Sequence, residues 1–225
     1  MGDYKMRYKG LIFDFDYTLG DSTDGIVLSV NYALEKLGFK RKNKEEIRKT
    51  IGLSLKDTYS ALTGKSDKEA GPFLKYFKEK ADQVMVENTI LYSDVKEVLQ
   101  ELKKEGYKIG IVTNKFRYRI EQILIWQHAS TLIDLIIGSE DVKIEKPNPE
   151  GLLWAIRHLQ LKKDEILYIG DSLVDAKTAE NAEVDFVAVL TGTTTTDEFQ
   201  LYKNVFIGKN LKDILSFITT HKILS

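Results

Sequence analysis

Short apolar runs recur along the chain, and each is bounded by polar or turn-forming residues. The first, GLIFDF at residues 10–15, ends in acidic side chains and a Tyr-Thr-Leu-Gly turn. Further runs of this kind lie at residues 108–113, 134–138, 165–170, 186–190 and 205–207. Because continuous apolar runs of this length are typical of strands buried on both faces, the pattern predicts the strands of one central sheet.

Hydrophobic positions at helical spacing separate these runs. One helix is predicted to begin after Ser93, which can act as its N-cap, and to end before Gly106. Another is predicted over residues 148–160, with Asn148 as its cap and Pro149 at the first helical position. The apolar faces contain Val95, Val98, Leu99 and Leu102 in the first helix, and Leu152, Ile156 and Leu159 in the second. Strands that alternate with helices predict the α/β class, with a Rossmann-like parallel sheet covered on both faces.

Residues 21–90 break this alternation, because their patterns are helical throughout. One amphipathic helix carries Ile26, Val30, Leu34 and Leu37 and is closed by Gly38. Two pairs that resemble capping boxes open further helices: Asn43 with Glu46, and Ser66 with Glu69. An insert of this length between two strands of a sheet is usually a functional lid or a second domain. We therefore predict a core of residues 1–20 and 91–225 and an all-helical cap domain of residues 21–90, called the cap below.

Charge and composition exclude several classes of protein. The 33 basic and 34 acidic side chains of the 225 residues nearly cancel, so no overall field favours nucleic acid or an anionic membrane as a partner. The chain contains no cysteine, which excludes disulfide scaffolds, thiolate metal sites and cysteine nucleophiles. No apolar segment reaches the length of a signal peptide or a membrane span, and we expect a cytoplasmic protein.

Two polar segments lie where the first predicted core strands end. Asp14 and Asp16 follow the first strand, at the edge of an open α/β sheet where ligands bind. Thr113-Asn114-Lys115 follows the next core strand, where a hydroxyl group and backbone N–H groups can hold phosphate oxygens. Taken singly, a solvated strand end and a helix cap are the commoner explanations of such residues.

Two further polar segments follow later strands. Lys146 precedes Pro147-Asn148-Pro149, whose prolines stiffen the loop, and we expect its side chain to be exposed. Asp171 and Asp175 follow the ILYIG run and lie four residues apart, a spacing that favours one face of a helical turn. An N-cap followed by an acid in the first turn, favoured by the helix dipole, is the commoner explanation of that pair.

All these segments lie at the carboxyl ends of predicted parallel strands, and therefore at one edge of one sheet. Together they supply carboxylates, a hydroxyl group and a lysine, which is a suitable set for Mg²⁺ and a phosphoryl group. Hard oxygen ligands suit Mg²⁺, which usually takes few protein carboxylates and completes its shell with water and phosphate.

The order and spacing of these segments resemble the haloacid dehalogenase superfamily of phosphohydrolases. DFDYTLGDS resembles the first motif of that family, VTN the second, EKPNPEG the third and YIGDSLVDA the fourth. The helical insert, with GLSLKDTY after its second helix, is most similar to the cap of the phosphoglycolate-phosphatase-like group. The resemblance covers nearly the whole chain and implies a phosphatase of small phosphomonoesters.

The resemblance also implies a role for each residue. Asp14 would attack phosphorus and form an aspartyl-phosphate, and Asp16 would protonate the leaving oxygen and then activate water. Mg²⁺ would be held by Asp14, the backbone carbonyl of Asp16 and Asp171. The substrate phosphate would be bound by Thr113, Asn114 and Lys146, and Asp175 would orient Lys146 or metal-bound water.

Two positions depart from the family pattern. Tyr17 replaces the usual glycine of the first motif, and we expect its backbone to avoid a glycine-only conformation and its ring to shape the pocket mouth. Ser93-Asp94 stands where Pro-Gly is common after the cap, which is expected to alter the hinge.

Two other functions use similar residues. A sugar-phosphate mutase like β-phosphoglucomutase would share Asp14 and Asp16 but needs polar cap groups that hold a sugar in two orientations. A phospho-receiver module also phosphorylates an aspartate, but it needs neither the insert nor an acid/base two residues later. The partner is expected to be a small phosphorylated metabolite, whose identity the motifs leave open, and the chain to be a monomer or a homodimer.

Overall fold

The central feature of the computed structural model is a six-stranded parallel sheet with the strand order β6-β5-β2-β7-β8-β9. The structure describes residues 4–5, 7–220 and 223–224. Its strands are β2 (Gly10–Phe13), β5 (Lys108–Val112), β6 (Leu135–Ile137), β7 (Ile166–Gly170), β8 (Asp185–Val189) and β9 (Phe206–Gly208). Every predicted apolar run forms one of these strands, which confirms the predicted Rossmann-like α/β class.

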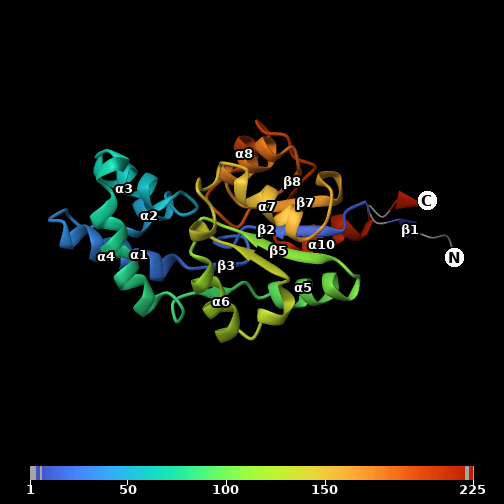
Figure 1. Cartoon of the computed structure of the whole chain (residues 1–225), viewed down its shortest axis with the longest axis horizontal. Coiled ribbons are helices and arrows are strands. Elements are labelled where there is room, and N and C mark those ends of the chain that lie inside the picture. Colours follow the sequence, from blue (N-terminus) through green and yellow to red (C-terminus); the bar gives the residue numbers. More distant parts are fainter. Residues whose placement is uncertain (1–3, 6, 221–222, 225) are drawn as a thin grey trace.

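Helices cover both faces of the sheet, as Figure 1 shows. The helices α5 (Val95–Lys104), α6 (Arg117–Trp126) and α10 (Leu211–Thr220) pack against one face, and α7 (Glu150–His158) and α8 (Leu173–Ala182) pack against the other. Alternate residues of β2 point to opposite faces, so Leu11 and Phe13 join one apolar cluster and Ile12 joins the other. All three side chains are fully buried, which explains why the strand is apolar without alternation.

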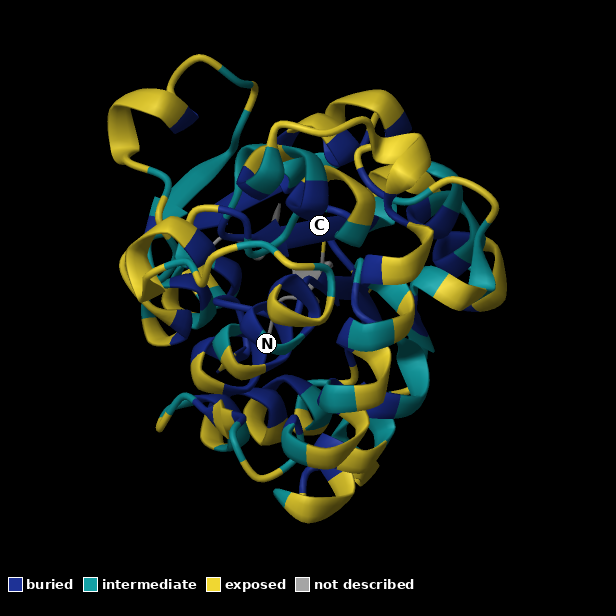
Figure 2. Cartoon of the chain, turned by 90° about the vertical axis from the view of Figure 1, so that its left-hand side faces the viewer, coloured by how far each residue is buried: buried dark blue, intermediate teal, exposed yellow. Residues whose placement is uncertain are grey.

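The segment between β2 and β5 is helical, as predicted, and lies at one end of the molecule (Figure 1). Its helices are α1 (Thr23–Lys36), α2 (Lys44–Arg48), α3 (Leu55–Thr63) and α4 (Gly71–Val84), with a short 3₁₀ turn, η1 (Asp67–Glu69). Seen from this end, buried residues line the inner faces of the helices and exposed residues line the outer faces (Figure 2). The division into a core and a cap at residues 21 and 90 stays a prediction, although the helices lie within those bounds.

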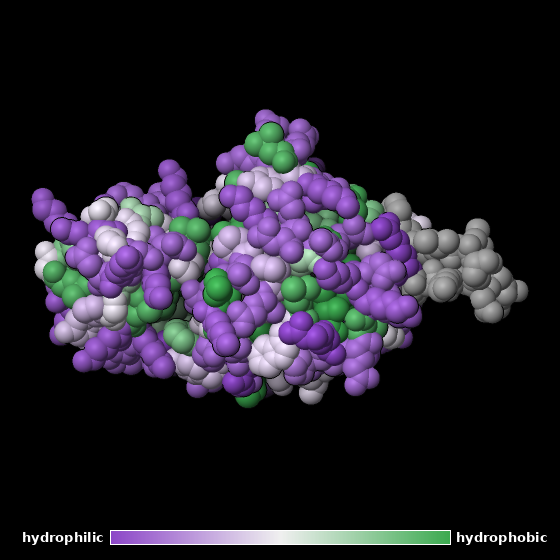
Figure 3. Space-filling model, turned by 45° about the horizontal axis from the view of Figure 1, so that its top comes forward, coloured by the Kyte–Doolittle hydropathy of each residue, from purple (hydrophilic) through white to green (hydrophobic). Residues whose placement is uncertain are grey.

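Two short antiparallel strands connect this helical segment to the sheet. β3 (Gly20–Asp21) precedes α1, β4 (Ile90–Leu91) follows α4, and Gly20 pairs with Leu91. The strands β1 (Tyr4–Lys5) and β10 (Ile223–Leu224) pair at the opposite end of the molecule (Figure 1). The sequence predicts neither pair, because each joins segments far apart in the chain. Two lobes are also visible in the space-filling view of Figure 3, where hydrophilic residues cover most of both.

Shorter elements complete the fold. They are the 3₁₀ turns η2 (Ser130–Leu132), η3 (Ser139–Asp141) and η4 (Lys163–Glu165) and the one-turn helix α9 (Thr196–Phe199). In the described part of the chain, no helix has both the length and the apolar character that crossing a membrane requires.

Three predicted helix starts differ in detail. Asp94, not Ser93, occupies the N-cap position of α5, and neither side chain makes a capping bond there. Pro149 occupies the N-cap position of α7, although Asn148 still accepts a hydrogen bond from the Glu150 N–H group. The capping box of Ser66 and Glu69 exists but opens η1, because α4 begins two residues after that box. The box of Asn43 and Glu46 opens α2 as predicted.

The packing of α3 against α4 predicts which substitution destabilises this segment. Phe73 is completely buried between Tyr59 and Phe77. We expect Phe73→Ala to lower the free energy of unfolding by about 3–5 kcal/mol, because a large apolar contact is lost and a cavity remains. Urea denaturation measures this change, and Lys75→Ala, an exposed change on the same helix, should stay within about 0.5 kcal/mol of wild type. Equal stabilities for the two variants would contradict the packing described.

Candidate active site

The predicted site residues meet at the carboxyl edge of the sheet, on the side that faces the helical segment. Asp14 follows β2, Thr113 follows β5 and Asp171 follows β7, so three neighbouring strands deliver them to one place. Lys146 reaches the same place from the loop between β6 and α7, and Asp175 from the first turn of α8. All five residues are buried.

Lys146 is the cation at the centre of the site. Its Nζ lies 2.8 Å from Asp14 Oδ1 and 2.7 Å from Asp175 Oδ1, and it donates a hydrogen bond to the Tyr168 hydroxyl group at 3.1 Å. The residue is only 6% exposed, so the prediction of an exposed lysine is wrong. Burial is possible because two carboxylates neutralise the ammonium group in a region that bulk water does not reach.

Crowding of buried acids shifts the pKa values of the site. Burial raises the pKa of Asp14 to about 6, although the ammonium group of Lys146 opposes the shift. Burial, with the nearby charges of Asp175 and Asp14, also raises the pKa of Asp171 well above its usual range. Burial disfavours the charged form of Lys146, but the attraction of Asp14 and Asp175 outweighs it and raises the pKa of that ammonium group.

Asp175 has both carboxylate oxygens engaged by protein groups. Oδ1 accepts hydrogen bonds from Lys146 and from the Tyr168 hydroxyl group at 2.9 Å. Oδ2 accepts from the backbone N–H group and the hydroxyl group of Ser172, at 3.1 and 2.6 Å. This arrangement fits a residue that orients Lys146 better than one that binds a metal directly. A Cβ at Gly170 would lie 2.4 Å from Asp175 Cβ, so the glycine is needed for this close approach.

The carboxylates fit a divalent cation. Asp14, Asp171 and Asp175 each place an oxygen within 4.8 Å of the others. Asp14 Oδ1 is buried and accepts no hydrogen bond from the described residues, despite its ion pair with Lys146. The hydroxyl group of Thr18 donates a hydrogen bond to Asp171 Oδ1 at 3.1 Å. Gly192 packs against the other oxygen, since a Cβ at that position would lie 2.0 Å from Asp171 Oδ2. Asp14 and Asp171 therefore supply the negative charge and the carboxylate oxygens that suit Mg²⁺.

Asp16 points away from this cluster and has partners of its own. Its two oxygens accept from Lys115 Nζ at 2.9 and 3.0 Å, and Oδ1 also accepts from the Ser22 hydroxyl group at 2.6 Å. The two acids of the first motif thus have separate environments. Lys115 was not among the predicted site residues, although it directly follows Thr113 and Asn114 in the sequence.

The two remaining predicted residues lie beside Lys115. Thr113 is buried and lines the cavity described below. Asn114 accepts from the Lys146 N–H group at 2.9 Å and donates to the carbonyl oxygens of Lys146 and Gly52 at 3.2 and 3.1 Å. Its amide group therefore ties the Lys146 loop to the cap, and phosphate binding by Asn114 stays a prediction.

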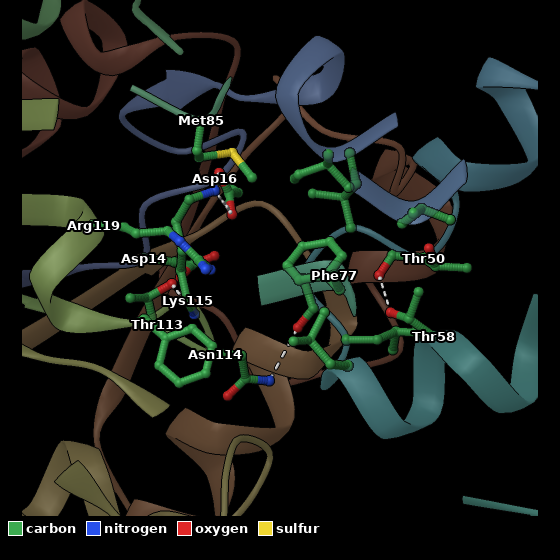
Figure 4. A pocket seen from close by; sticks show the side chains of 17 residues that line it. Asp14, Asp16, Thr50, Thr58, Phe77, Met85, Thr113, Asn114, Lys115 and Arg119 are labelled. Carbon is green, nitrogen blue, oxygen red and sulfur yellow. Dashed lines mark hydrogen bonds and ion pairs between the residues drawn. The ribbon is translucent and has the colours of Figure 1, made fainter. Parts of the chain in front are cut away.

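A cavity of about 50 Å³ lies between the cap and the core. Figure 4 shows Asp14, Asp16, Thr113 and Lys115 on one side of it and Phe77 on the other. The lining from the core is Asp14, Asp16, Thr113, Asn114, Lys115, Phe116 and Arg119, and that from the cap is Ile26, Val30, Thr50, Ile51, Gly52, Leu53, Leu55, Thr58, Phe77 and Met85.

Tyr17 adopts a left-handed backbone conformation, with φ at 59°. This region favours glycine but is open to other residues, so the prediction that Tyr17 avoids a glycine-only conformation is not contradicted. Its carbonyl oxygen accepts from the Thr191 hydroxyl group, and its own hydroxyl group bonds to Thr23 at 2.6 Å and accepts from Arg48 at 3.3 Å. These contacts hold the strained residue between the core and the first two helices of the cap.

Comparison with known proteins agrees with this geometry. A family model described as haloacid dehalogenase-like hydrolase matches residues 11–189. Pyrophosphatase PpaX of Bacillus mycoides is 31% identical over 95% of this chain and 98% of its own length. A haloacid dehalogenase-like hydrolase from Bacteroides fragilis superposes with a TM-score of 0.89 at 43% identity, over 92% of this chain and 99% of that one. A predicted phosphoglycolate phosphatase from Haemophilus somnus superposes with a TM-score of 0.81 at 27% identity, over 94% of this chain and 98% of that one.

The chain belongs to the haloacid dehalogenase-like hydrolase family and is a phosphatase of that family. The predicted resemblance to the phosphoglycolate-phosphatase-like group is confirmed.

The raised pKa of Asp14 predicts how the metal-free protein responds to pH. Its pKa is raised on folding from 3.8 to about 6, so folding takes up a proton between these values and stability falls as the pH rises through them. The Asp14→Asn variant has a neutral amide in place of this carboxyl group, so it should lack this loss and exceed wild type by roughly 1–3 kcal/mol at pH 7. Urea denaturation with chelator at pH 4.5 and pH 7 measures both proteins, and a variant less stable than wild type at pH 7 would contradict the assignment.

Proposed function

We propose that the chain is a Mg²⁺-dependent phosphatase that transfers the phosphoryl group of a small phosphomonoester to Asp14 and then to water. The observation that carries the proposal is the buried group of Asp14, Asp171 and Asp175 around Lys146, at the sheet edge that faces the cavity. Buried carboxylates so close together are costly in an empty site. A bound cation would offset that cost and would allow an anionic phosphoryl group to approach the carboxylates.

Asp14 is proposed as the nucleophile, because it reaches both the cation cluster and the cavity. Its carboxylate oxygen attacks phosphorus and the bond from phosphorus to the leaving oxygen breaks. Lys146 neutralises phosphate oxygens and is held for that role by Asp175. Mg²⁺, held by Asp14, Asp171 and the backbone carbonyl of Asp16, would supply further neutralisation of the phosphoryl charge.

Asp16 is proposed as the proton carrier. It lines the cavity, so it has access to the leaving oxygen of a bound ester and later to the attacking water. Its partners Lys115 and Ser22 differ from those of Asp14, so the two acids lie in separate environments. Water attacks phosphorus of the aspartyl-phosphate, Asp16 takes up the proton of that water, and Asp14 is regenerated.

The cap lining disfavours a sugar-phosphate mutase. Two of its residues carry polar side chains, and both bond to the backbone: Thr50 donates to the Ile47 carbonyl oxygen and Thr58 to the Thr50 carbonyl oxygen. The other lining side chains of the cap are apolar. A mutase needs hydroxyl-binding groups there. A receiver module is disfavoured because it requires no insert over its phosphorylated aspartate.

The proposed substrate is a small phosphorylated metabolite. PpaX is named a pyrophosphatase and the Haemophilus protein a predicted phosphoglycolate phosphatase, so pyrophosphate and phosphoglycolate are proposed for the first assays. Nucleic acid and membranes are not proposed as partners, given the balanced charge. A cytoplasmic location and a monomeric or homodimeric state remain proposals from the sequence.

Metal dependence is tested through Asp171. We expect turnover of nitrophenyl phosphate to vanish in chelator and to return with Mg²⁺. Asp171→Asn should weaken Mg²⁺ binding at least about 10-fold, because it replaces a charged ligand with a neutral one. The Mg²⁺ concentration that raises the melting temperature by half its maximal shift reports binding without catalysis. Asp197→Asn, at an exposed acid of α9, is the matched control. Full activity in chelator would contradict the metal assignment.

The division of labour between Asp14 and Asp16 is tested by trapping the intermediate. Asp14→Asn should abolish both phosphorylation and turnover. Asp16→Asn should still be phosphorylated by nitrophenyl phosphate, whose leaving group needs no proton, but should lose the base that activates water. Phosphate should therefore accumulate on Asp14. Mass spectrometry of acid-quenched protein detects the label, and phosphate on Asp16 or in the Asp14→Asn variant would overturn the assignment.

A further inference from the structure

Arg119 is a buried cation in the wall of the active-site cavity. It lies in the first turn of α6, its side chain is 2% exposed, and Figure 4 shows it entering the cavity from the same side as Asp14 and Lys115. Arginine is seldom buried without a specific use, because its guanidinium group loses hydration. The proposed chemistry at Asp14 and Lys146 gives it no role.

Partners from the cap hold this guanidinium group in place. Its Nη2 donates to Asp82 Oδ1 at 2.7 Å and to the Lys78 carbonyl oxygen at 3.3 Å, and its Nε donates to Asp82 Oδ1 at 3.1 Å. Tyr118 donates a third hydrogen bond to Asp82 Oδ1. The rings of Phe77 and Phe116 lie 5.9 and 5.0 Å from the guanidinium carbon. The remaining nitrogen, Nη1, has no partner among the described residues.

Other polar side chains of the cavity wall are already paired with protein groups. Both oxygens of Asp16 are shared with Lys115, which cancels the charge of that lysine within the cavity. Asn114 is bonded to backbone groups at both ends of its amide. The partner of Arg119, by contrast, stands outside the lining, and the Asp82 side chain is 42% exposed, where water screens it. Within the lining that the structure describes, Arg119 is thus the cation whose charge no cavity carboxylate cancels.

We propose that Arg119 is a specificity-determining residue that binds a second anionic group of the substrate, next to the phosphoryl group held at Asp14. The inference rests on the proposed phosphatase function. Nη1 donates to the second anion, while Asp82 fixes the other two donor positions and so sets the direction of the fork. The surrounding apolar wall strengthens the interaction, because it excludes water.

The size of the cavity limits the substrate. A water molecule needs roughly 10–15 Å³ of such volume, so about 50 Å³ holds about four waters. The second anion must therefore be a small group, such as a carboxylate or another phosphate, within a few bonds of the phosphoryl group. The competing explanation is that Arg119 only clamps α6 to α4 through Asp82.

Matched substrate pairs separate the two explanations. In each pair one phosphate compound carries a second anionic group and the other does not. Two pairs are esters, phosphoglycolate with ethyl phosphate and 3-phosphoglycerate with glycerol 1-phosphate, and the third compares the anhydride pyrophosphate with methyl phosphate. The measured quantity is the ratio of kcat/KM within a pair, which is independent of the fraction of folded enzyme. We expect wild type to prefer the anionic member of at least one pair. Arg119→Gln should reduce that preference about 10- to 100-fold, as loss of a charged hydrogen bond implies, and Arg119→Lys should restore part of it.

Two control variants make the outcome decisive. Arg117→Gln is the same change two residues away, on a side chain that is 41% exposed and paired with Asp141, and should leave the preference unchanged. Asp82→Ala breaks the clamp from the cap side but keeps the charge of Arg119, and should retain a larger share of the preference than Arg119→Gln does. If Asp82→Ala and Arg119→Gln lower both members of a pair equally, or if wild type prefers neither member while it hydrolyses nitrophenyl phosphate, the inference is wrong and the phosphatase proposal stands. Absence of any phosphatase activity would overturn the proposed function itself.

Discussion

Burial of several carboxylates around one ammonium group is the constraint on which the rest of this site depends. Asp14 Oδ1 and Asp175 Oδ1 lie 2.8 and 2.7 Å from Lys146 Nζ, and removal of Lys146 would leave two acids buried without a counter-charge. The backbone is adapted to this density of charge. Gly170 leaves room for Asp175 and Gly192 leaves room for Asp171, at positions where any side chain would collide. The crowded buried carboxylates therefore lower the stability of the fold at the position where the proposed chemistry requires charge.

The parallel sheet makes this crowding possible. The neighbouring strands β5, β2 and β7 end at one edge of the sheet, so residues about a hundred positions apart in the sequence lie within a few ångströms of one another. Their positions are set by the strands and do not depend on long loops. The apolar interior of the strands anchors each of them rigidly. The same edge faces the helical segment, whose lining is mainly apolar. Charge on the core side and apolar surface on the cap side together define the pocket, and buried cations such as Arg119 then determine which polar substrates fit.

Much of the fold and most of the charged site follow from the sequence, because both depend on local signals. Apolar runs without alternation identify the six strands, and acids that directly follow such runs must lie at the sheet edge. Arg119 and Lys115 were not predicted as site residues, because a single basic residue near the start of a helix is usually exposed to solvent. The partner of the buried Arg119 is a cap residue, Asp82, which lies 37 positions away in the sequence. The left-handed conformation of Tyr17 likewise depends on contacts with Thr23, Arg48 and Thr191, which no local pattern encodes.

The two acids of the first motif differ most in how they are connected to the cap. The side chain of Asp14 contacts groups of the core, Lys146 above all. Asp16 instead accepts from Ser22, whose hydroxyl group accepts in turn from Thr89, and these two residues flank the paired strands β3 and β4 that join the cap to the sheet. A displacement of the cap on these links would therefore change the surroundings of Asp16 before it changed those of Asp14. The side chain of Asp14 is thus held by the core, whereas that of Asp16 is bonded to the segments that join the cap to the sheet, so of the two acids the proposed proton carrier is the one tied to the position of the cap.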